Sequence, residues 1–165
     1  MGANETFGKV WKKSAMIGAG WGLVSGIISL GTVAMFRPEV LAAANSAEAL
    51  GKAGILVIIG FALLGLGILV NLITGYLAAK ENGSTEMGEA AIAGLLGGVV
   101  FGAAMFVLNT IFSVLNVALG YTTGASQAFG LAAVIVGQLI GAVVGIPISA
   151  VIALVGGIIY TAIKK

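Results

Sequence analysis

The sequence predicts an all-α integral membrane protein in which four transmembrane helices form a bundle packed through glycine-rich faces. Of its 165 residues, 59% are apolar and 8% are charged, whereas soluble domains carry roughly 25% charged residues. Four apolar stretches each exceed the roughly 20 residues that a helix needs to cross a hydrocarbon core of about 30 Å. They are too long for membrane β-strands, which have about 10 residues. Residues 14–165 are therefore predicted to form a single membrane domain.

The first predicted span covers residues 14–36 and follows a basic amphipathic foot, residues 1–13. We expect this foot to lie on the cytoplasmic membrane surface, because lysine contacts anionic headgroups and tryptophan favours the interface. The residues assigned to headgroup contact are Lys9, Trp11, Lys12 and Lys13. The apolar run is longer than that of a signal peptide, which has about 7 to 15 residues, so we expect no cleavage.

The remaining spans are predicted at residues 53–79, 90–119 and 129–163. The last two exceed the length needed to cross the membrane, so we expect them to tilt or to kink. Pro147 lies near the middle of the last span, and because proline cannot donate a backbone hydrogen bond we expect a kink there. Such a kink is either a tolerated distortion or, as in some transporters, part of a gate or binding site.

Basic residues are distributed unevenly between the two sides of this four-span arrangement. The side of the termini holds Lys9, Lys12, Lys13, Lys80, Lys164 and Lys165, and the other side holds Arg37 and Lys52. Cytoplasmic segments of membrane proteins carry an excess of lysine and arginine. Both termini are therefore predicted to be cytoplasmic.

Glycine occurs in three G-x-x-x-G-x-x-x-G triplets, one in each of the first, third and fourth spans. Lipid tails are as apolar as leucine, so helix association in a bilayer depends on close backbone approach and on hydrogen bonds between helices. We expect the four helices to meet along these small faces, with further packing between protomers. The predicted packing residues are Gly18, Gly22, Gly26, Gly60, Gly67, Gly94, Gly98, Gly102, Gly137, Gly141 and Gly145.

Four carboxamide side chains fall within the predicted spans: Asn71, Asn109, Asn116 and Gln138. Each lies on or beside the small face of its helix, so we expect all four to point into the bundle. Counting along the spans at 1.5 Å per residue puts Asn71 in the inner half and the others in the outer half. Gln138 falls between the levels of the two asparagines of the third span, which predicts a hydrogen bond between the third and fourth spans.

Two sets of residues repeat along the chain. The triplet that begins at Gly18 matches the one at Gly94 at an offset of 76, and Tyr76 matches Tyr160 at an offset of 84. The two halves are then either parallel two-helix repeats or glycine-rich segments that converged, and the sequence leaves both interpretations open.

The residue types exclude most catalytic chemistry. The sequence has no cysteine and no histidine, and its six acidic residues are glutamates outside the apolar stretches. Thiol and imidazole chemistry, and carboxylate pairs within the membrane, are thereby excluded. We predict no enzyme activity and no catalytic, cofactor or metal site. A formal charge of +2 also gives no basis for nucleic-acid binding.

These features predict a non-catalytic structural or assembly subunit that packs through glycine-rich helix faces in a larger membrane complex, a homo-oligomer or an envelope. Its expected partners are the lipid bilayer and either further copies of itself or other membrane subunits. The alternative is a channel or facilitator for a small neutral or weakly polar solute, lined by asparagine and glutamine. Ion-coupled transport is disfavoured, because no ionisable residue lies within the spans.

Overall fold

The computed structural model describes residues 3–42, 47–120 and 125–164, and within these ranges the protein is entirely helical. The helices are α1 (Ala3–Ala42), α2 (Ala47–Asn82), α3 (Met87–Ala118) and α4 (Ala125–Lys164). Each contains a stretch long and apolar enough to cross a membrane, and these stretches are Asn4–Ala34, Gly54–Asn82, Met87–Ala118 and Gly130–Lys164. The prediction of an integral membrane protein with four membrane-spanning helices is confirmed at this level.

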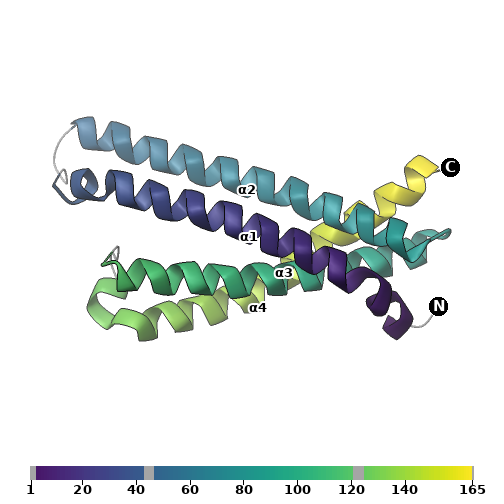
Figure 1. Ribbon diagram of the computed structural model, residues 1–165. Coiled ribbons are helices and arrows are strands. Elements are labelled where there is room, and N and C mark those ends of the chain that lie inside the picture. Colours follow the sequence, from purple (N-terminus) through teal and green to yellow (C-terminus); the bar gives the residue numbers. More distant parts are fainter. Residues whose placement is uncertain (1–2, 43–46, 121–124, 165) are drawn as a thin grey trace.

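The helices alternate in direction, so that α1 and α3 run one way, α2 and α4 run the other way, and both termini lie at the same end (Figure 1). The central pair is α2 and α3, since each of them contacts all three other helices. In the part of the chain that the structure describes, no Cα atom of α1 lies within 8 Å of one in α4. The bundle is therefore a rhombus in cross-section, with α1 and α4 at opposite corners.

The helices are longer than the predicted spans, chiefly around the first connection. α1 continues to Ala42 and α2 begins at Ala47, whereas the sequence predicts a connection over residues 37–52. Residues 43–46 of that connection, like residues 1–2 of the predicted foot, lie outside the described residues. At the other end, α1 already begins at Ala3, so the described part of the foot is continuous with the first membrane helix.

The foot packs onto the bundle through one of its faces. Thr6, Val10 and Ser14 follow one another at four-residue spacing and are all buried. Val10 lies in the main core cluster, with Ala78, Ala79, Ala90, Ala93 and Tyr160. One face of the predicted interfacial foot is therefore covered by the end of the bundle, with Val10 fully buried.

Two glycines mark changes of chain direction. At the end of α2, Gly83 takes a φ of 70°, and the amides of Gly83 and Ser84 donate to the carbonyl oxygens of Lys80 and Ala79 at 3.1 Å each. This is the Schellman motif, which satisfies carbonyls that a helix end would otherwise leave without donors. Within α4, Gly130 has φ 61° and ψ −142°, a combination that only glycine adopts readily.

The non-helical backbone within α4 is at Gly130, near the start of the helix, and it is separate from the kink that the sequence predicts at Pro147. The backbone at Pro147 keeps helical φ and ψ, because a φ near −65° suits a helix, although the ring removes one hydrogen bond and crowds the carbonyl of Val143. Figure 1 nevertheless shows the yellow second half of α4 running in a different direction from its green first half.

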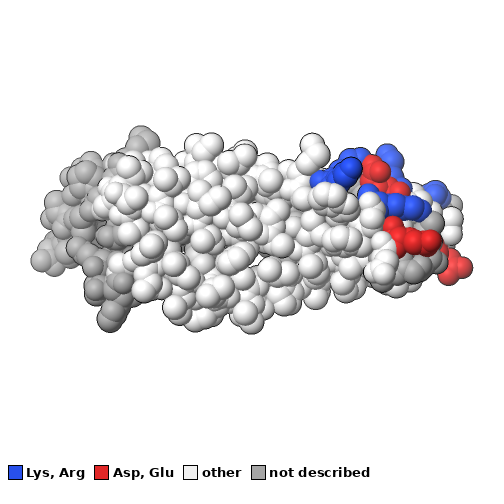
Figure 2. All heavy atoms as spheres, turned by 60° about the horizontal axis from the view of Figure 1, so that its bottom comes forward, with Lys and Arg blue, Asp and Glu red and all other residues white. Residues whose placement is uncertain are grey.

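The core is concentrated at the end that holds both termini. We call residues 3–18, 71–82, 87–102 and 149–164 the terminal half, and the remainder of the described helices the far half. Tyr76 and Tyr160 pack edge to face in the terminal half, with ring centroids 5.3 Å apart. The described charged side chains also gather at this end, as Figure 2 shows for one face of the molecule.

Candidate functional site

The glycine triplet of α1 packs against α3. A Cβ placed on Gly18 would lie 2.6 Å from the carbonyl oxygen of Phe101, and one on Gly22 would lie 2.9 Å from a methyl group of Leu108. A Cβ on Gly26 would overlap the ring of Phe112. The absence of a side chain at these three positions is what allows α1 and α3 to approach this closely.

The glycine triplet of α3 packs against α4 in the same manner. Cβ atoms on Gly94 and Gly98 would each lie 2.5 Å from a backbone carbonyl oxygen of α4, those of Ala153 and Ser149 respectively. A Cβ on Gly102 would lie 3.2 Å from the Cα of Ile146. These are backbone contacts, so no rotamer change could relieve a substitution at the first two positions.

Four further glycines make similar contacts but are absent from the predicted set: Gly75, Gly97, Gly156 and Gly157. A Cβ on Gly156 would meet the carbonyl group of Leu72, and one on Gly157 that of Ala90. Gly97 is followed by Gly98, and Gly157 follows Gly156. In each pair the two glycines point toward different neighbouring helices. A search for triplets on a single face finds Gly98 but misses Gly97, and it misses both glycines of the pair at 156 and 157.

The glycine triplet of α4 makes no close contact with another helix. Gly137, Gly141 and Gly145 are exposed, and a Cβ on any of them would meet no atom within 4 Å. The prediction that this triplet packs closely inside the bundle is wrong, because the close backbone contacts of α4 with α2 and α3 lie further along the helix, at residues 146–157. In α2, a Cβ on Gly60 would likewise meet no atom within 4 Å. A Cβ on Gly67 would lie 3.2 Å from the indole nitrogen of Trp21.

Asn71 ties α2 to α4 in the terminal half. Its Nδ2 donates to the carbonyl oxygen of Ser149 at 3.0 Å and to the Ser149 hydroxyl at 2.8 Å. Asn71 is 3% exposed, and its Oδ1 is buried without a hydrogen-bond partner among the described residues. The side chain therefore points into the bundle, as the sequence predicts.

In the far half, the predicted hydrogen bond between the third and fourth spans is present. Gln138 Nε2 on α4 donates to Ser113 Oγ on α3 at 2.8 Å. The acceptor is thus a serine that lies between the two asparagines, Asn109 and Asn116, along α3. The Oδ1 of Asn116 is buried and has no partner in the described structure.

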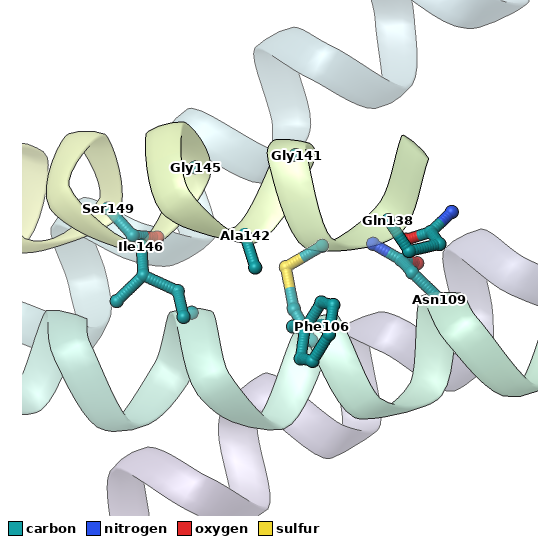
Figure 3. Close-up of a pocket in the computed structure, with 10 residues that line it drawn as sticks. Phe106, Asn109, Gln138, Gly141, Ala142, Gly145, Ile146 and Ser149 are labelled. Carbon is teal, nitrogen blue, oxygen red and sulfur yellow. The ribbon is translucent and has the colours of Figure 1, made fainter. Parts of the chain in front are cut away.

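A pocket of about 220 Å³ lies between α3 and α4, next to this hydrogen bond. It is lined by Gly102, Met105, Phe106, Asn109, Gln138, Gly141, Ala142, Gly145, Ile146 and Ser149. Figure 3 shows Asn109 and Gln138 together at one end and Ser149 at the other, with Phe106, Ala142 and Ile146 between them. Two of the three open glycines of α4 thus line this pocket.

The chemistry of the pocket is limited to packing and neutral hydrogen bonding. Its polar lining groups are two carboxamides and one hydroxyl, and none of its lining residues is ionisable. The described residues hold no group of three or more carboxylate, imidazole or thiol side chains that could bind a metal ion. For scale, a cavity of about 150 Å³ admits a molecule the size of benzene. The pocket can therefore receive a bulky side chain or a small neutral molecule.

Comparison of the chain with protein-family models, with curated proteins and with solved structures finds no match. The function is therefore inferred from the residues and the geometry described above.

Proposed function

We propose that this protein is a non-catalytic membrane subunit that assembles laterally with further copies of itself or with another membrane protein. The assembly surface is the face of α4 that carries Gly137, Gly141 and Gly145. In this proposal both termini are cytoplasmic. Assembly of this kind requires no reactive side chain, and the pocket beside this face has no ionisable lining residue.

The main support for this proposal is a difference between the three glycine triplets. Those of α1 and α3 are in contact with another helix of the chain, and that of α4 is not. In a bilayer, van der Waals contact between closely approaching backbones is a principal force for helix association. A face that offers this contact and lacks a partner within the chain is suited to a helix from another protomer.

The distribution of charge supports the proposed orientation. Lys9, Lys12, Lys13, Lys80 and Lys164 lie at the helix ends on the side of the bundle that holds the termini. The positive-inside rule associates such an excess with the cytoplasmic side. Accessibility of single cysteines, introduced near each terminus into this cysteine-free chain, to an impermeant reagent in sealed vesicles would test the orientation.

Gly137 offers the sharpest test of assembly, because it belongs to the open face but does not line the pocket. We expect Gly137→Leu to weaken self-association at least about tenfold, since a large side chain would hold the backbones apart. The matched control is Gly60→Leu, which alters an equally open glycine on α2. Association would be measured by energy transfer between labelled copies in liposomes over a range of dilutions. A Gly137→Leu variant that associates as the unmodified protein does would contradict self-assembly through this face.

The second candidate function is passage of a small neutral solute, and the pocket with Asn109 and Gln138 favours it. The packing of the terminal half argues against an open path, because Asn71 is bonded to Ser149 at the inner end of the pocket. Urea or glycerol flux into liposomes distinguishes the two functions. We expect no flux above that of protein-free vesicles. Flux that Ala142→Leu abolishes, by filling the pocket, would favour transport instead.

A further inference from the structure

A second hollow lies at the charged end of the bundle, between α1 and α2. This groove is broad and open, with a volume of about 700 Å³, and it is separate from the pocket between α3 and α4. Its lining residues from α1 are Lys9, Lys12, Lys13, Met16 and Ile17, and those from α2 are Leu77 and Glu81.

The groove changes from charged to apolar along the axis of the bundle. Lys9, Lys12 and Lys13 occupy the part of α1 nearest the terminus, and Met16 and Ile17 follow one turn further into the predicted span. α2 runs antiparallel to α1, so Glu81 lies at the level of the lysines and Leu77 lies below them. The polar part of the groove is therefore at the membrane edge and the apolar part faces the hydrocarbon.

The charges in the groove sum to +2, from three lysines and one glutamate. Lys13 Nζ donates to Glu81 Oε1, so the single acid of the groove is already paired with a cation. Lys12 Nζ lies 5.8 Å from the centre of the ring of Trp11, which is itself exposed at this level. An anion that enters the groove thus meets a net positive charge, and the one carboxylate of its lining is paired with Lys13.

We propose that this groove binds an anionic phospholipid, with its phosphate against the lysines and one acyl chain along Met16, Ile17 and Leu77. The positive charge selects an anionic headgroup, because lysines near a membrane surface attract anionic lipid. The apolar floor selects a lipid over a soluble phosphate, because only a lipid covers these side chains.

The charge requirement is tested on the full chain in detergent by native mass spectrometry, which counts bound lipids. Phosphatidylglycerol and phosphatidylcholine with identical acyl chains are titrated in parallel. We expect the unmodified protein to prefer phosphatidylglycerol, and the double variant Lys9→Gln with Lys12→Gln to lose about tenfold of that preference. The matched control is Lys80→Gln with Lys164→Gln, which removes two charges at the same end but outside the groove. We expect the control to change the preference less than about twofold.

The acyl-chain contact is tested separately with Met16→Asn and with soluble glycerol 3-phosphate. Met16 is 74% exposed, so the substitution leaves the fold intact, and we expect weaker retention of both lipids with an unchanged preference between them. Glycerol 3-phosphate is expected not to compete at concentrations that exceed that of the lipid about a hundredfold. Three results would overturn the proposal: no preference in the unmodified protein, equal losses in the two lysine variants, or competition by glycerol 3-phosphate.

Discussion

In the terminal half, small residues bring α2, α3 and α4 into backbone contact, whereas in the far half the same residue type lies largely beside open space. All the buried residues other than glycine, among the side chains that the structure describes, lie in the terminal half or in the turn that ends α2. Phe61, in the far half of α2, is 71% exposed. Glycine content alone therefore does not produce tight packing, because a second helix must lie opposite.

The two halves also differ in how their polar groups are used. Asn71 makes two hydrogen bonds to Ser149 within the buried terminal half, whereas Gln138 makes one hydrogen bond to Ser113 at a half-buried position beside the pocket. The terminal half resembles a completed core. The far half retains an open glycine face and a pocket, which are the features expected of a surface that receives a partner or a ligand.

The largest contrast between the halves is expected from adding one methyl group to a glycine. Gly156→Ala places a Cβ against the carbonyl group of Leu72, and such overpacking costs about 2 kcal/mol or more. Gly141→Ala meets no atom within 4 Å, so it should leave stability unchanged or raise it by at most about 1 kcal/mol through helix propensity. Reversible unfolding in mixed detergent and SDS micelles measures both. Equal effects of the two substitutions would contradict the described difference between the halves.

A smaller effect is expected at Asn71. Asn71→Leu keeps a similar volume and removes both hydrogen bonds to Ser149, so we expect a loss of about 1 to 2 kcal/mol, near the upper end of values for membrane helices. The same unfolding assay applies. Asn109→Leu, a change of the same type in the lining of the far-half pocket, is the control and should cost less.

The smallest effect is expected at Gln138. Gln138→Leu removes one half-buried hydrogen bond to Ser113, and we expect a loss of about 0.6 kcal/mol, the average for such bonds between membrane helices. A Ser113→Ala variant should lose a similar amount, and the double variant should lose no more than either alone. Additive losses would show that the two side chains do not interact.

Hydropathy and spacing predict individual helices well and their neighbours poorly. The four spans follow from apolar length, and the inward face of α1 follows from the spacing of Gly18, Gly22 and Gly26. The periodicity of one helix does not say which helix lies opposite. It therefore could not reveal that α4 leaves Gly141 open, or that Val10 of the foot is covered by the bundle.

The internal matches illustrate the same limit. Tyr76 and Tyr160, matched at an offset of 84, contact each other across α2 and α4. The glycine triplets matched at an offset of 76 pack on different helices, α3 for the triplet of α1 and α4 for that of α3. A symmetric pair of repeats would place equivalent triplets in equivalent contacts, so this packing does not reproduce the symmetry that the matches suggest.

The backbone conformation at Gly130 has a consequence for how α4 fits the thickness of a bilayer. A straight helix of 40 residues would be about 60 Å long, roughly twice the hydrocarbon depth. The apolar stretch that predicts the last span begins at residue 129, so the non-helical backbone at Gly130 lies where the predicted crossing starts. The stretch Gly130–Lys164 has 35 residues and would still be about 52 Å long, so separating the first residues of α4 shortens the rod only slightly. The final crossing must also tilt or bend to match the bilayer.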